Sequence, residues 1–167
     1  MNAGRNAGPA APRIPGMEAR LEYSKKSPVG YRAYLALNRF VEDCGIERPL
    51  LELIKIRASQ INGCAFCLDM HTIDARAAGE TEQRLYLLDA WREAPFYSGR
   101  ERAALAWTEA VTLVGDTHVP DDVSEEARRH FSEEELVNLT WAVVTINGWN
   151  RMAIAFRAQA GRHKTGS

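Results

Sequence analysis

Apolar side chains recur every three or four residues along most of this chain. Between Pro28 and Gly45, for example, Ala33, Leu37 and Phe40 fall on one face of a helix. No stretch alternates apolar and polar positions for long enough to indicate a strand. From about Ser27 onward, the pattern therefore predicts an all-α fold.

Proline, glycine and capping residues divide this pattern into separate helices. Two serines followed three residues later by glutamate, Ser98 with Glu101 and Ser132 with Glu135, have the spacing of a capping box. We expect helices over 28–44, 49–61, 64–78, 81–94, 98–115, 123–130, 132–147 and 149–159. The last two are separated by an expected break at Gly148, because Asn-Gly commonly interrupts helices.

One tripeptide occurs twice in a similar context. Ile61-Asn62-Gly63 and Ile146-Asn147-Gly148 each follow an apolar helix and precede another helical stretch. This repetition predicts an internal helix-break-helix duplication. In the second copy, Trp149 and Met152 stand where the first copy has Cys64 and Cys67, so only the first copy would carry chemistry.

The length of 167 residues suits one domain. We expect residues 1–15, rich in proline and small residues, to form a flexible arm. Residues 16–160 would form the helical domain, and residues 161–167 a frayed polar tail. A net charge of −1 gives no electrostatic reason to expect a nucleic-acid or membrane partner. No apolar run is long enough to span a bilayer, and the N-terminus lacks a secretion signal, so we expect a cytoplasmic protein.

The stretch with most chemical content is Cys64-Ala65-Phe66-Cys67, followed four residues later by His71. In a helix, Cys64, Cys67 and His71 lie on one stripe within two turns. The break at Asn62-Gly63 places Cys64 at the start of this helix, where unpaired backbone N–H groups and the helix dipole stabilise a thiolate. A second thiol three residues later can then close a disulfide.

Three interpretations of this cluster remain open from the residues alone. The first is a redox-active dithiol with His71 moving protons. The second is a metal site, although zinc prefers four ligands and only three lie close together in the sequence. The third is a pair of buried cysteines acting as small hydrophobic residues, as we expect for Cys44. Three cysteines, an odd number, argue against a disulfide-stapled fold. The chain has no glycine-rich phosphate loop, so we expect no nucleotide cofactor.

Together with an upstream carboxylate, this cluster resembles the signature of a known family. Glu52, eleven residues, Cys64-x-x-Cys67, three residues and His71 are similar to the motif of the AhpD-like alkylhydroperoxidases, within the carboxymuconolactone decarboxylase superfamily. The flanking segments, Leu53 to Arg57 and Trp149 to Arg151, are similar too. The resemblance implies that Cys67 reacts with peroxide and that Cys64, the more accessible sulfur, is its disulfide partner. Glu52 and His71 would form a proton relay.

The resemblance also sets expectations for fold, cofactors and partners. It implies an all-α domain, often with internal duplication, that assembles into a homo-oligomer: a dimer, trimer or hexamer. The expected activity is reduction of organic hydroperoxides through a redox-active Cys64–Cys67 disulfide, with no metal or other cofactor. The electron donor would be a lipoyl protein, a thioredoxin-like protein or a small thiol. Phe66 stands where some relatives carry a second histidine, which predicts weaker turnover and a more apolar cleft.

Two other classes of function stay open. One is a non-enzymatic redox-sensing or stress-linked oligomeric protein, in which the disulfide changes the assembly. The other is a small-molecule lyase or isomerase of the wider superfamily.

Overall fold

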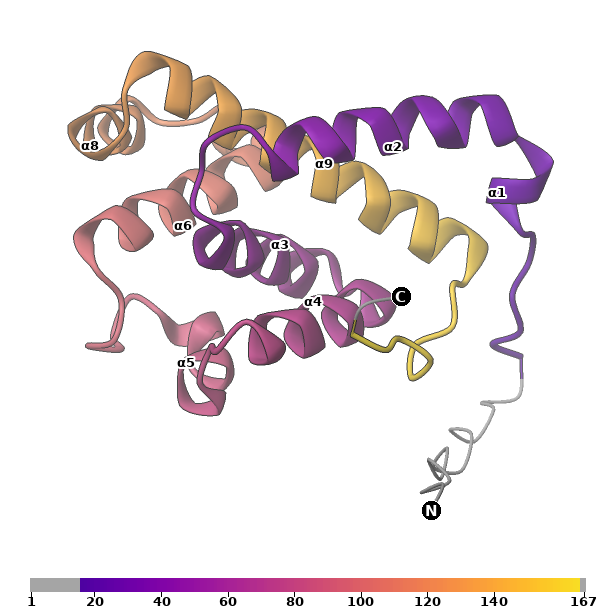
Figure 1. Ribbon diagram of the computed structural model, residues 1–167. Helices are drawn as coiled ribbons and strands as arrows, with labels where there is room; N and C mark the ends of the chain where they lie inside the picture. Colours follow the sequence, from indigo (N-terminus) through magenta and orange to yellow (C-terminus); the bar gives the residue numbers. More distant parts are fainter. Residues whose placement is uncertain (1–15, 166–167) are drawn as a thin grey trace.

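A computed structural model of the protein describes residues 16–165, so the expected arm over 1–15 lies outside the described residues. The described part is helical and contains no strand, which confirms the all-α fold class (Figure 1). Its helices are α1 (Tyr23–Lys26), α2 (Pro28–Glu42), α3 (Arg48–Asn62), α4 (Ala65–Ala77), α5 (Glu82–Tyr86), the 3₁₀ helix η1 (Leu88–Ala90), α6 (Gly99–Thr112), α7 (Val114–Thr117), α8 (Asp121–His130) and α9 (Glu133–Phe156).

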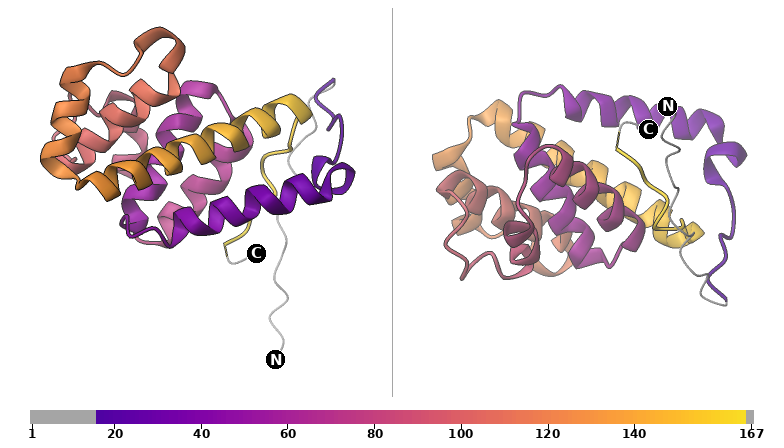
Figure 2. Two further views of the ribbon diagram at one scale, coloured as in Figure 1. Left: turned by 90° about the horizontal axis from the view of Figure 1, so that it is seen from above. Right: turned by 60° about the horizontal axis from the view of Figure 1, so that its bottom comes forward.

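Helix α3 is the centre of the domain. It packs against α4, α6 and α9, and its side chains are buried on all faces, with Leu53 and Ile54 fully inaccessible to solvent. Helix α2 runs alongside the long helix α9 on the outside of this group (Figures 1 and 2). Because α3 is covered on every side, the polar residues of this helix are buried together with its apolar ones.

Most expected helix boundaries agree with the structure to within a few residues. Both capping boxes are present, with Ser98 and Ser132 each accepting a hydrogen bond from the backbone N–H of the glutamate three residues later. The expected helix over 81–94 is wrong: α5 ends at Tyr86 and is followed by the short 3₁₀ helix η1. The four-residue helix α1 was not expected.

The expected break at Gly148 is also wrong. Helix α9 continues through Asn147 and Gly148 without interruption, so the second Ile-Asn-Gly does not repeat the helix break of the first. Gly148 instead permits a close contact: a Cβ atom at this position would lie 1.8 Å from the hydroxyl oxygen of Tyr34. That hydroxyl donates a hydrogen bond to the carbonyl oxygen of Thr145, at 2.9 Å. The glycine allows α2 to approach α9.

The chain after α9 turns back toward α4. The backbone N–H of Gly161 donates a hydrogen bond to Asp69, at 2.7 Å, and His163 Nε2 lies 2.8 Å from an oxygen of Asp74. Gly161 and His163 thus contact α4, while the boundaries of the domain and the fraying of the tail over 161–167 stay predictions.

Candidate active site

The central helix α3 carries a stripe of polar side chains toward one side. Glu52, Lys55, Ser59 and Asn62 follow one another at spacings of three, four and three residues, so they share one face of the helix. Glu52, Lys55 and Ser59 are buried. Buried polar groups need partners within the protein, and this stripe finds them on α4 and α9.

The two cysteines lie where α3 turns into α4. Gly63 ends α3 in the left-handed conformation, with φ of 67°, which glycine adopts without a steric penalty. Cys64 is then the N-cap of α4, and its sulfur lies 2.7 Å from that of Cys67, with which it shares a hydrogen bond. Both residues are only 1% exposed. The structure thus brings the thiols together as predicted, but the greater accessibility expected of Cys64 is not observed.

Of the two thiols, Cys64 is the first to lose its proton. The hydrogen bond with Cys67, helped by the backbone N–H groups of Cys67 and Phe66, lowers the pKa of Cys64 to about 7 against the opposing effect of burial. The pKa of Cys67 is raised, because it shares its hydrogen with Cys64 and because it is buried. The pair can therefore hold one negative charge near neutral pH.

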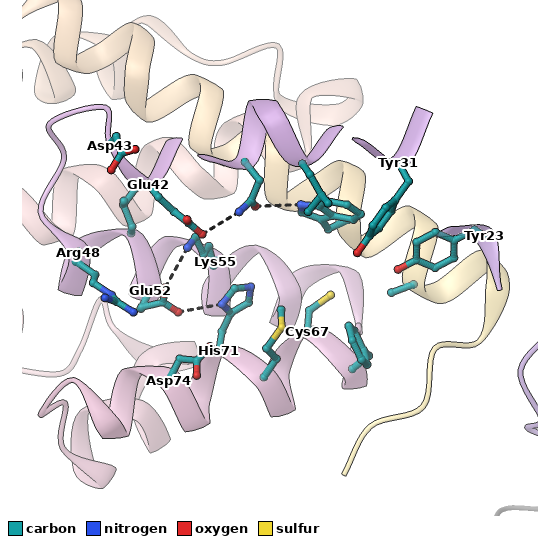
Figure 3. A pocket seen from close by; sticks show the side chains of 17 residues that line it. Tyr23, Tyr31, Glu42, Asp43, Arg48, Glu52, Lys55, Cys67, His71 and Asp74 are labelled. Carbon is teal, nitrogen blue, oxygen red and sulfur yellow. Dashed lines mark hydrogen bonds and ion pairs between the residues drawn. The ribbon is translucent and has the colours of Figure 1, made fainter. Parts of the chain in front are cut away.

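Glu52 and His71 meet although they lie nineteen positions apart in the sequence. His71 Nδ1 lies 2.9 Å from Glu52 Oε2, and Lys55 Nζ donates a hydrogen bond to Glu52 Oε1, at 3.0 Å (Figure 3). Burial alone would raise the pKa of Glu52, but the hydrogen bond with His71 and the charge of Lys55 lower it to about 2. An ionised Glu52 orients the imidazole with Nδ1 protonated, which leaves Nε2 as a proton acceptor.

Cys67 and His71 line one cavity of about 510 Å³ between α2, α3, α4 and α9. One part of its wall is aromatic, with Tyr31, Phe66 and Trp149, and another part is charged. Cys64 is not among the lining residues. A small molecule that enters the cavity therefore meets Cys67, whereas Cys64 lies behind the cavity wall.

A buried amide on α9 is linked to the polar stripe of α3 close to the thiols. Asn150, with no exposed surface, donates a hydrogen bond to Ser59 Oγ and accepts one from Asn62, each at 2.9 Å. Its amide also lowers the pKa of both Cys64 and Cys67. We did not select Lys55, Ser59 or Asn150 as site residues from the sequence. The regular spacing of polar residues in the apolar helix α3 could have indicated the first two.

The third cysteine, metal binding and membrane spans concern parts of the chain outside the dithiol site. Cys44 is half-buried and packs against an apolar cluster of α2, α3, α6 and α9, as expected. Between residues 16 and 165, no group of three or more histidine, cysteine or acidic side chains is arranged to hold a metal ion. In the same part of the chain, no helix is both long enough and apolar enough to cross a bilayer.

Comparison with known proteins shows the family to which the chain is related. Residues 28–110 match the carboxymuconolactone decarboxylase family. The uncharacterised protein YdfG of Bacillus subtilis is 46% identical over 144 residues, which cover 86% of this chain and 98% of YdfG. The chain belongs to the carboxymuconolactone decarboxylase family. The segment that carries Glu52, the dithiol and His71 lies within the matched residues.

Solved structures of relatives support an AhpD-like member of this family. One, from Agrobacterium tumefaciens, is of a protein of unknown function described as a candidate antioxidant defence protein AhpD. It has a TM-score of 0.85 and 46% identity, covering 87% of this chain and all of that chain. The debrominase Bmp8 has a TM-score of 0.71 over 83% of this chain and 74% of its own. At 21% identity, that likeness shows a common fold and no more.

Proposed function

We propose that this protein is a thiol-dependent peroxidase that reduces organic hydroperoxides through a Cys64–Cys67 disulfide. The observation that carries the proposal is the position of Cys67. Its sulfur lies 2.7 Å from a second thiol, and it lines the same cavity as the Glu52-bound imidazole of His71. These groups match the nucleophile, the resolving thiol and the acid–base pair that such a reaction needs.

The chemistry can be written with these groups. The Cys64 thiolate accepts the proton of Cys67 along their shared hydrogen bond while the Cys67 sulfur attacks the O–O bond of the hydroperoxide. Cys67 is oxidised to a sulfenic acid, and the peroxide is reduced to an alkoxide that takes up a proton to become the alcohol. The Cys64 thiol then attacks the sulfenic acid, which releases water and forms the disulfide. Two electrons and two protons from a thiol donor restore the dithiol.

His71 and Glu52 serve these proton transfers without a direct hydrogen bond to the sulfurs. Among residues 16–165, no hydrogen bond joins His71 to Cys64 or Cys67. We therefore assign His71 Nε2 to proton exchange through the substrate or a water molecule in the cavity. Glu52 holds the ring in place and stabilises its protonated form.

The electron donor has to reach a buried disulfide. Because Cys64 and Cys67 are each 1% exposed, a donor thiol must enter through the cavity or follow a local opening of the site. A small thiol, the dihydrolipoyl arm of a lipoyl protein and a thioredoxin-like protein each satisfy this requirement in one of the two ways. No metal or organic cofactor takes part in these steps, and the reaction is compatible with the cytoplasm, where thiols are kept reduced.

We also propose that the protein is a homo-oligomer. Val137, Trp141 and Val144 recur at spacings of four and three residues along α9, and they are 56%, 44% and 42% exposed. Large apolar side chains that form such a stripe are commonly covered by a second subunit. Sedimentation of the purified protein tests this assignment, and a monomer at micromolar concentration would contradict it.

Aromatic walls next to Cys67 favour one further substrate class. Tyr31, Phe66 and Trp149 could hold a flat halogenated ring, such as the 2,3,4-tribromopyrrole found in complex with a variant of the debrominase Bmp8. A thiolate can take the halogen from such a ring as a sulfenyl halide while the ring carbon takes up a proton, and the second thiol then displaces halide and loses its proton as the disulfide forms. The same residues would act, so a brominated pyrrole belongs in the panel of substrates.

Steady-state turnover of cumene hydroperoxide with dithiothreitol tests the proposal. We expect Cys67→Ser and Cys64→Ser to abolish turnover, and His71→Ala and Glu52→Gln to slow it by about a hundredfold. Cys44→Ser is the matched control, because it removes a thiol outside the site and should retain the wild-type rate.

The other classes of function give different results in this assay. Equal rates across the set of variants would exclude the thiol mechanism. A redox sensor would change oligomeric size on oxidation without turnover, and a lyase or isomerase would remain active after loss of both thiols.

A further inference from the structure

Two tyrosine hydroxyls face the reactive end of the cavity. Tyr23 on α1 and Tyr31 on α2 both line it, and Figure 3 shows their hydroxyl groups directed toward Cys67 from the opposite wall. Neither hydroxyl forms a hydrogen bond with any residue that the structure describes. Tyr34, one helical turn after Tyr31, differs in this respect, because its hydroxyl donates to the carbonyl oxygen of Thr145. Two of the three phenols thus remain available to a ligand.

Packing fixes the position of both rings. The ring of Tyr31 lies edge-on to Trp149 with 5.7 Å between centroids, and 6.1 Å from the ring of Tyr23. Tyr23 also packs on Phe156, at 5.7 Å. Aromatic contacts of this kind hold a ring without using its hydroxyl. The hydroxyl groups are therefore positioned in the cavity before any ligand enters.

The proposed reaction needs an acid at this place. When Cys67 attacks the terminal oxygen of a hydroperoxide, the oxygen bonded to carbon leaves as an alkoxide, a strong base that must be protonated. His71 is held by Glu52 through Nδ1, and no hydrogen bond in the described part of the chain brings it to Cys67, whereas the two phenols face that sulfur directly. A phenol has a pKa of about 10, so it keeps its proton at neutral pH and is still far more acidic than an alcohol. Burial, and then the proximity of Tyr31 and Cys67, raises the pKa of Tyr23 further.

We propose that Tyr23 and Tyr31 are catalytic residues, which bind the leaving oxygen of a hydroperoxide at Cys67 and supply its proton. This inference rests on the proposed peroxidase function. One phenol transfers a proton to the alkoxide and becomes a phenolate, while the second stabilises the negative charge by a hydrogen bond. A proton returns to the phenolate from His71 or from water in the cavity, so the tyrosines are unchanged over the cycle.

Single-turnover oxidation by two oxidants with different leaving groups tests the inference. Cumene hydroperoxide releases an alkoxide and needs an acid, whereas peracetic acid releases acetate, a weak base that does not. We would compare the reduced wild type with Tyr23→Phe, Tyr31→Phe and the double variant by rapid mixing and alkylation of the remaining thiols. Tyr34→Phe is the control, since it loses a phenol on the same helix outside the cavity.

We expect the double variant to react about a hundredfold more slowly with cumene hydroperoxide and within twofold of wild type with peracetic acid. Each single variant should lie between, and Tyr34→Phe should match wild type with both oxidants. An equal loss with both oxidants would assign the tyrosines to structure and overturn the inference, as would an unchanged rate with cumene hydroperoxide. If wild type itself does not react with cumene hydroperoxide, the proposed function fails first, and this inference fails with it.

Discussion

Replacing Glu52 with glutamine tests the buried charge cluster most sharply. In the folded protein the pKa of Glu52 is about 2, whereas the ordinary value is 4.5. A difference of about 2.5 in pKa corresponds to about 3 kcal/mol of stability contributed by the ionised carboxylate. Glu52→Gln also leaves the buried Lys55 without its charged partner, and breaking a buried ion pair typically costs a similar amount. Both figures describe the loss of the same interactions, so they do not add. We expect the free energy of unfolding to fall by about 3 kcal/mol at pH 7.

The sign of the pH dependence follows from the direction of the shift. Because the folded state lowers the pKa of Glu52, its contribution is complete above about pH 5 and is lost as the pH falls toward 2. The difference in unfolding free energy between wild type and Glu52→Gln should therefore stay constant from pH 7 to pH 5. By pH 3 it should fall by about half.

Urea denaturation followed by circular dichroism, from pH 7 to pH 3, measures this difference. Glu42→Gln is the matched control, because Glu42 lines the same cavity but is exposed, and its replacement should change stability by no more than about 0.5 kcal/mol. A difference between wild type and Glu52→Gln that is the same at pH 7 and pH 3 would refute the linkage of this carboxylate to folding.

Three further predictions concern other parts of the molecule. Gly148→Ala should lower the melting temperature, because the new Cβ would meet the Tyr34 hydroxyl; stabilisation by about 1 kcal/mol, expected from helix propensity alone, would contradict this contact. The rate of alkylation of the dithiol by iodoacetamide should rise with a midpoint near pH 7, set by Cys64, whereas a midpoint near pH 9 would argue against a stabilised thiolate. Ser98→Ala and Ser132→Ala should each cost about 1 kcal/mol in chemical denaturation, and a negligible cost would show that the capping boxes are not formed.

Much of the fold could be predicted from local sequence, because local interactions determine it. Capping boxes at Ser98 and Ser132 and the left-handed turn at Gly63 involve residues that are close in the chain. The wrong prediction at Gly148 concerns a position whose environment is set by a residue far away in the sequence. Gly148 has the sequence of a helix break, but it lies within a continuous helix and makes room for Tyr34 of α2, more than a hundred residues away.

In the candidate site, too, some features follow from local sequence and others depend on the packing of distant helices. The stripe of Cys67 and His71 follows from helical spacing, and the pairing of His71 with Glu52 was expected only from the family resemblance. No local rule connects Asn150 with the thiols, since α9 reaches them only through the packing of α3 against it. Burial of Cys64 has the same origin, because α9 contributes residues such as Ile146 and Ala153 to the cluster that contains both sulfurs.

Mass spectrometry of the reduced protein after one equivalent of cumene hydroperoxide gives the most direct test of the central claim. We predict one disulfide between Cys64 and Cys67 and one equivalent of alcohol per subunit. In Cys64→Ser, oxidation should stop at a sulfenic acid on Cys67 that a dimedone probe traps. A protein that retains both thiols in the reduced state, or one in which the label appears on Cys44, would contradict the assignment of Cys67 as the residue that reacts with peroxide.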